Sequence, residues 1–156
     1  MKRHPRWIRH FLSDGDFDAI ARAIESAEAR TSAEIRVHLE RRVPRRRWRT
    51  PSDALERARQ VFAGLGMHRT RERNGVLIYL VVEDRRLAIV GDEGIHARVG
   101  EAYWARVRDL MVEKLRDRQP REAILTAIDE IARALGEHFP RRPDDRDELS
   151  DEVSVD

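Results

Sequence analysis

The sequence contains no cysteine, very little lysine and no long apolar run. Without cysteine, disulfides, thiolate catalysis and cysteine-based zinc sites are excluded, and a reducing compartment is compatible with the chain. No stretch of 18 apolar residues occurs, so we expect no membrane-spanning helix. The basic start, residues 1–10, lacks the apolar segment of a signal peptide, and we therefore expect a cytoplasmic protein.

Charge is what the sequence has in abundance. Charged residues make up 38% of the 156 residues, yet the formal net charge is only +2. Only Lys2 and Lys114 among the 31 basic residues are lysine, so arginine carries nearly all of the positive charge. The length predicts one domain with a core of its own.

Apolar periodicity predicts four helices and three strands. Helical spacing predicts helices over residues 13–30, 52–64, 104–115 and 120–139. Alternation over residues 33–40 predicts a half-buried strand whose polar side chains face away from the core. The unbroken apolar run 76–82 predicts a central strand covered on both faces, and residues 86–90 return as its antiparallel partner.

The order of these elements predicts an α/β fold. A right-handed crossover makes the first two strands parallel, so the chain should form an α/β/α sandwich with a small mixed sheet and helices on both faces. We expect a basic N-terminal segment over residues 1–12, the domain over 13–140 and a disordered acidic tail over 141–156. In that tail, residues 143–156 hold seven acidic residues and one arginine.

Four short segments, in order and spacing, resemble the TPM domain family over roughly residues 11–140. They are Thr31-Ser32-Ala33-Glu34-Ile35, Asn74-Gly75-Val76-Leu77-Ile78, Glu83-Asp84-Arg85-Arg86 and Gly91-Asp92-Glu93-Gly94-Ile95-His96. The last is similar to a segment of the subgroup without signal peptides. The resemblance implies an α/β/α sandwich, and it implies calcium binding and acid phosphatase activity as proposed for parts of the family. Members with ligand chemistry often carry a Glu and an Asp after the third strand, where this chain has His96 and Gly100.

Four carboxylates should lie at the end of the sheet where ligands bind in α/β folds, beyond the carboxyl ends of the parallel strands. They belong to Asp14, Asp16, Glu83 and Asp84. Ca²⁺ takes six to eight oxygen ligands, and these side chains could supply several of them. Each also has a structural use, because Asp caps helices and shapes turns, and neighbouring arginines oppose a cation.

The connector between the first strand and the second helix holds six arginines around Trp48. Arg45, Arg46 and Arg47 precede a helix N-terminus, where free N–H groups favour phosphate, so they are candidate anion ligands. The alternative is a solvated loop. Trp48 could stack on a base, but the acidic tail and the near-neutral net charge argue against nucleic acid.

Two further features allow alternatives. The opposite end of the sheet should hold Asp92, Glu93 and His96, whose spacing matches no strict metal-ligand pattern. Residues 2–12 could form a basic amphipathic helix, which would bind a membrane surface or pack on its own domain.

The sequence favours a non-enzymatic binding or accessory domain that acts through a protein partner or an anion at the arginine-rich connector. It contains no recognisable nucleophile–base pair or phosphate loop. The alternative is a weak acid phosphatase, with or without Ca²⁺, in which Asp84 is the carboxylate nearest the substrate and the connector arginines hold phosphate. Both hypotheses require the connector and the 83–85 turn to share one rim of the sheet.

Overall fold

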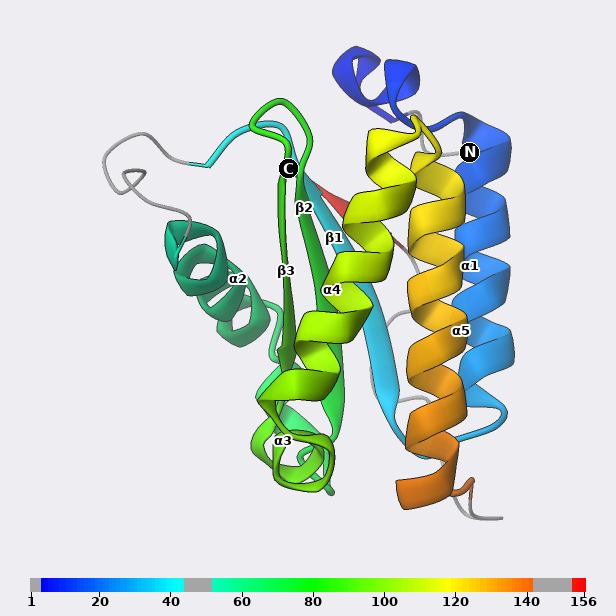
Figure 1. Cartoon of the computed structure of the whole chain (residues 1–156), viewed down its shortest axis with the longest axis vertical. Helices are drawn as coiled ribbons and strands as arrows, with labels where there is room; N and C mark the ends of the chain where they lie inside the picture. Colours follow the sequence, from blue (N-terminus) through cyan, green and yellow to red (C-terminus); the bar gives the residue numbers. More distant parts are fainter. Residues whose placement is uncertain (1–3, 44–51, 142–152) are drawn as a thin grey trace.

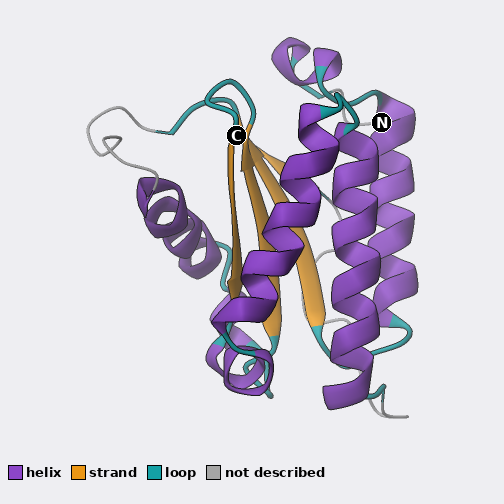
Figure 2. Cartoon of the chain, in the orientation of Figure 1, coloured by secondary structure: helices purple, strands orange, loops and turns teal. Residues whose placement is uncertain are grey.

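The computed structural model describes residues 4–43, 52–141 and 153–156, which form a central sheet with helices around it (Figures 1 and 2). The elements are η1 (Arg6–His10), α1 (Asp14–Glu28), β1 (Glu34–Glu40), α2 (Ser52–Gly64), η3 (Met67–Arg69), β2 (Gly75–Val81), β3 (Arg86–Gly91), α3 (Glu93–Val99), α4 (Glu101–Arg116), α5 (Pro120–His138) and β4 (Ser154–Val155).

The sheet has the order β3-β2-β1-β4. Strands β1 and β2 are parallel, with Val37 opposite Ile78, and β3 returns antiparallel to β2. These pairings confirm the predicted mixed sheet. The two-residue strand β4, which the sequence analysis did not predict, pairs in parallel with the free edge of β1.

Helices cover both faces of the sheet, which confirms the predicted sandwich. Figure 1 shows α1, α4 and α5 on one face and α2 on the other. The larger core lies under the three helices, where side chains such as Ile35 and Ile78 meet Ile24 of α1 and Ile131 of α5. The smaller core lies under α2 and includes Phe62 and Tyr79.

The predicted helical faces agree with the burial. The side chains of Ile124, Ile128 and Ile131 on α5 are buried, as their spacing indicates. On α4 the buried residue is Met111, whereas Leu110 is exposed. The sequence analysis predicted no helix over residues 93–99, which form the short helix α3, and its N-cap Asp92 accepts a hydrogen bond from the Glu93 N–H.

The polar face of β1 differs from the prediction. Its side chains were expected to face solvent, but His38 and Glu40 are each only 3% exposed. They share a face with Tyr79, which lies opposite His38, and α2 and β4 enclose that face. A buried histidine and a buried carboxylate therefore lie next to each other on a strand that seemed half exposed.

The described segments nearest the two ends of the chain pack against the main body. Ile8 and Leu12 are buried in the larger core, with Trp7 and Phe11 packed against it, as expected if this segment packs on its own domain. Residues 142–152 of the predicted acidic tail lie outside the described residues, whereas the segment after them supplies β4. In the described part of the chain, no helix has the length and apolar character needed to cross a membrane.

Candidate functional site

An open depression of about 340 Å³ lies where β1 ends, at the end of the sheet marked C in Figure 1. It is lined by Glu40, Arg41, Arg42, Arg57 and Asp156. Three elements build it, because β1 runs into Arg41 and Arg42, α2 contributes Arg57, and β4 ends in Asp156. This is the end of the sheet beyond the carboxyl ends of the parallel strands, where α/β folds bind ligands.

Glu40 is fixed in this depression by two partners. Arg57 donates to both carboxylate oxygens, with Nη2 2.6 Å from Oε1 and Nε 3.2 Å from Oε2, and the Tyr79 hydroxyl donates to Oε2 at 2.7 Å. Burial alone would raise the pKa of Glu40. The neighbouring His38, the hydrogen bonds from Arg57 and Tyr79 and the charge of Arg57 outweigh burial and lower that pKa to about 2. Glu40 is therefore ionised throughout the physiological range.

The pKa values of the two partners of Glu40 are raised rather than lowered. Burial, together with the hydrogen bond to Glu40, raises the pKa of Tyr79 far above its ordinary value. The hydrogen bond to Glu40 also raises the pKa of Arg57. Tyr79 therefore stays neutral and Arg57 charged, and both act as permanent donors to the carboxylate.

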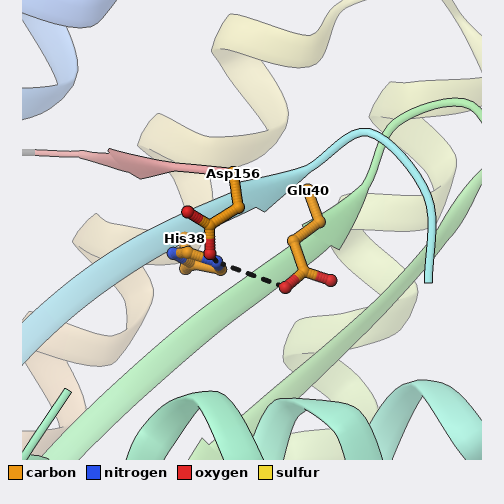
Figure 3. A group of neighbouring side chains, drawn as sticks. All are labelled: His38, Glu40 and Asp156. Atoms are coloured by element: carbon orange, nitrogen blue, oxygen red, sulfur yellow. Dashed lines mark ion pairs between the residues drawn. The ribbon is translucent and has the colours of Figure 1, made fainter. Parts of the chain in front are cut away.

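His38 lies beside Glu40 with both ring nitrogens facing specific groups. Its Nδ1 is 2.6 Å from Ser154 Oγ, whose hydroxyl donates to the carbonyl oxygen of Val37 at 3.3 Å. When the hydroxyl proton is used in that bond, Oγ accepts from Nδ1–H; in the other tautomer the hydroxyl donates to Nδ1. The other nitrogen, Nε2, is 3.2 Å from Asp156 Oδ2 and 3.6 Å from Glu40 Oε1 (Figure 3). Within the described residues, these three are the one group with the make-up of a metal ligand set.

Arg41 and Arg42 join the depression to the β2–β3 turn. Their Nε atoms lie 2.6 Å and 2.5 Å from the two oxygens of Glu83, and these hydrogen bonds lower the pKa of Glu83. In the same turn, Asp84 accepts a hydrogen bond from the backbone N–H of Val43 at 3.1 Å. The start of the connector and the acidic turn thus share one rim, as the predicted chain directions required.

The predicted carboxylate set is distributed over separate interactions. Asp16 forms a capping box with Ser13 and lies 3.5 Å from Arg121 of α5. Asp14 lies in the first turn of α1, whereas Glu83 and Asp84 are bound to the β1 end of the connector. Arg45, Arg46, Arg47 and Trp48 lie outside the described residues.

At the opposite end of the sheet, Asp92 is engaged in ordinary structural contacts. Its carboxylate accepts from Arg73 Nε at 3.0 Å and from the Glu93 N–H at 2.8 Å. His96 lies on the exposed side of α3. Asp92 therefore anchors the start of α3 to the loop before β2.

Sequence reasoning missed His38 and Asp156 as candidate residues. The available signal was a histidine and a glutamate two positions apart in a strand, which places both on the same face. That face was interpreted as solvent-exposed, so the pair received no further weight. No pattern in the sequence indicated that Asp156 would join it.

The chain is an α/β sandwich with an open depression at the carboxyl end of the parallel strands of a mixed sheet, and comparison with known proteins places it in a family. The model of the TPM domain matches residues 8–134, and the chain belongs to this family. It is similar to the NMR structure of the BA42 protein from the psychrophilic bacterium Bizionia argentinensis, with 36% identity and a TM-score of 0.83, over 94% of this chain and 96% of that one.

Two more distant structures share the fold alone. The N-terminal domain of the cg2496 protein from Corynebacterium glutamicum has 15% identity and a TM-score of 0.60, over 86% of this chain and 85% of that one. The N-terminal domain of a protein from P. gingivalis has 19% identity and a TM-score of 0.57, over 85% and 82%. No curated protein matches the sequence significantly.

Proposed function

We propose that this chain is a non-enzymatic binding domain of the TPM type that recognises an anionic group of a protein partner at the rim formed by Arg41, Arg42 and Arg57. The supporting observation is the open depression, into which three guanidinium groups from two elements converge. Arginine suits this role because its planar fork can bind a phosphate or carboxylate through two parallel hydrogen bonds.

Arg41 and Arg42 are the groups available to such a ligand. Glu83 contacts each through Nε, and the two side chains remain 53% and 54% exposed. Glu83 therefore holds both guanidinium groups in place, which lowers the entropy that a ligand must remove on binding. Arg57 donates hydrogen bonds to the Glu40 carboxylate through both Nε and Nη2, so its role is to shape the depression. The connector continues from Val43 to Arg45, Arg46 and Arg47, and we include these in the proposed surface.

Amide NMR titration of the full chain tests this proposal. Inorganic phosphate, and a phosphoserine peptide compared with its unphosphorylated form, are added at constant ionic strength, because salt screens such contacts. We expect shifts confined to residues 41–47 and 82–86, with the phosphorylated peptide binding more tightly. The double variant Arg41→Ala/Arg42→Ala should weaken binding at least about 10-fold, since one charge-assisted hydrogen bond contributes about 1.5–3 kcal/mol.

The control is a second double variant that removes two positive charges away from the proposed surface. Arg22 of α1 and Arg108 of α4 are exposed arginines on the other side of the sheet, so Arg22→Ala/Arg108→Ala should bind phosphate as the parent chain does. Equal weakening by both double variants would reduce the effect to net charge and contradict the proposed surface.

The alternative proposal is a weak acid phosphatase in which Asp84 lies nearest the substrate. It gains support from the position of Asp84 on the same rim as Arg42, whose charge it faces. The test is hydrolysis of a generic phosphate ester across acidic pH, with Ca²⁺, with Mg²⁺ and with neither, in the parent chain and Asp84→Asn. Hydrolysis that is absent, or unchanged in the variant, would remove this alternative.

A further inference from the structure

The Nε2 atom of His38 is a buried polar atom without a hydrogen bond. The side chain is 3% exposed, and neither nearby carboxylate meets the geometry of a hydrogen bond with this atom. In the tautomer in which Nδ1–H donates to Ser154, the neutral ring directs the lone pair of Nε2 toward Glu40 and Asp156. A buried nitrogen lone pair facing two carboxylates is electrostatically costly, and either a proton on that nitrogen or a cation between the three groups removes the repulsion.

The three donor atoms have the separations of a coordination shell. Nε2 is 3.2 Å from Asp156 Oδ2 and 3.6 Å from Glu40 Oε1, and all three atoms lie within 4.8 Å of one another. Two ligands about 2.1 Å from a zinc ion in tetrahedral geometry would be about 3.4 Å apart. Each atom comes from a different side chain, and Figure 3 shows the three side chains pointing toward one another.

We propose that His38, Glu40 and Asp156 form a binding site for a divalent transition-metal ion of the zinc class. An imidazole nitrogen with two carboxylates suits Zn²⁺ and its first-row neighbours, whereas Ca²⁺ and Mg²⁺ select oxygen ligands. The site shares none of its residues with the four carboxylates that the sequence suggested for Ca²⁺. It does not depend on the proposed recognition of anions.

The surroundings of the ligands fit this use. Ligating histidines commonly donate their second N–H to a fixed acceptor, and Ser154 Oγ, 2.6 Å from His38 Nδ1, is placed to be that acceptor and to orient the ring. Arg57 and Tyr79 similarly orient the Glu40 carboxylate. Arg57 offsets one negative charge and so lowers the attraction of the site for a cation, which leaves His38 and Asp156 to contribute much of the affinity.

Three protein ligands leave a coordination position for a further group. Glu40 and Asp156 both line the depression, so this position faces the side where Arg41 and Arg42 lie. An open fourth position is typical of zinc sites that bind water or an exchangeable ligand, whereas purely structural zinc sites are closed by four protein ligands.

The full chain, treated with a chelator and then dialysed, is titrated with Zn²⁺ by calorimetry at neutral pH. We expect one Zn²⁺ per chain, and retention of Zn²⁺ in a large excess of Ca²⁺. In long-range nitrogen NMR spectra, the His38 Nε2 resonance should shift while Nδ1 stays protonated. His38→Gln and Asp156→Asn should each weaken binding more than about 100-fold, because loss of an outer-shell partner alone costs about 10- to 100-fold.

The controls separate this site from other histidines and from misfolding. His68→Gln removes an exposed histidine and should bind Zn²⁺ as the parent chain does. Asp156→Asn retains the backbone bonds of Asp156 to Leu39 and Arg41, so β4 stays paired if His38→Gln fails to fold. The absence of 1:1 binding would leave only an ion pair between protonated His38 and the carboxylates and would overturn the proposal. Binding that persists in Asp156→Asn, or that Ca²⁺ displaces at equimolar concentration, would overturn it as well.

Discussion

Gly94 lies at a position where the backbone of another segment leaves no room for a side chain. A Cβ atom at this position would lie 2.4 Å from the carbonyl oxygen of Glu72 and 2.7 Å from that of Arg73. Both neighbours are backbone atoms, and the Gly94 N–H donates to the Arg73 carbonyl at 3.0 Å. The start of α3 is therefore pressed against the loop before β2, and neither side has a flexible side chain that could move away.

We expect Gly94→Ala to lower the free energy of unfolding by about 1–3 kcal/mol, because the overlap outweighs the better helix propensity of alanine. Urea denaturation measures the change. Gly64→Ala is the matched control, since no atom lies within 4 Å of its Cβ, and it should leave the stability equal or slightly higher. If Gly94→Ala left the free energy of unfolding unchanged, the start of α3 and the loop before β2 would be able to move apart without cost, contrary to this argument.

The two tyrosines should resist ionisation. Burial, and then the charge of Glu130, raise the pKa of Tyr103 to about 12, and the pKa of Tyr79 is raised further. Absorbance at 295 nm should therefore show almost no phenolate at pH 10 in the folded chain, whereas the unfolded chain in guanidinium is half ionised near that pH.

The stability should change with pH in the same range. Since both folded pKa values exceed the unfolded value of about 10, the stabilisation is fully present below pH 10; the part from Tyr103 is lost as pH rises through about 12, and the part from Tyr79 is lost at higher pH. A phenolate signal at pH 10 in the folded chain would contradict the burial of these hydroxyls.

Individual residues also show what the sequence could and could not predict. The capping role of Asp16 was one of the two uses weighed for it, because Ser13 three positions earlier is a recognisable helix start. Glu83 and Arg41 were placed on one rim because chain direction alone determines it. The position of Asp156 had no comparable signal, since its segment is acidic and its partner His38 lies more than 100 residues away.

At the scale of elements, α1 depends on its first turn. Ser13 Oγ accepts from the Asp16 N–H at 3.1 Å, and Asp16 Oδ2 accepts from the Ser13 N–H at 2.9 Å. Ser13→Ala should lower the free energy of unfolding by about 1 kcal/mol in thermal or urea denaturation. Ser26→Ala, an exposed position within the same helix, should have little effect, and equal losses in both variants would contradict the capping argument.

Long, strongly periodic elements were the ones that the sequence predicted well. Helices α1, α4 and α5 and strand β2 bury the faces that their spacing indicates. The seven-residue α3 and the two-residue β4 are too short for periodicity to detect. The missing β4 also made the prediction for β1 wrong, because β4 helps to bury the polar face of β1 that alternation alone had assigned to solvent.

For the molecule as a whole, the two faces of the sheet are covered unequally. Among the described residues, 27 buried side chains form the core under α1, α4 and α5, whereas nine form the core under α2. Opening the α2 face exposes less apolar surface, so it should require less free energy than opening the other face.

Native-state hydrogen exchange checks this difference. We expect amides within α2, such as those of Ala58 and Val61, to exchange through a smaller opening free energy than those of Ile128 and Ile131 in α5. The difference in opening free energy between the two helices should be measurable at low urea concentration and should vanish near the global unfolding transition. Identical protection in α2 and α5 would indicate one cooperative unit and would contradict independent opening.

The pairing of β4 with β1 has a consequence for the order of assembly. His38 and Ser154 are 116 residues apart and two backbone pairs join the strands, so a short pairing closes a long loop. The rest of the sheet can form earlier, since β1, β2 and β3 follow one another closely. During refolding, tryptophan fluorescence of the main core should therefore recover before the last edge of the sheet is occupied.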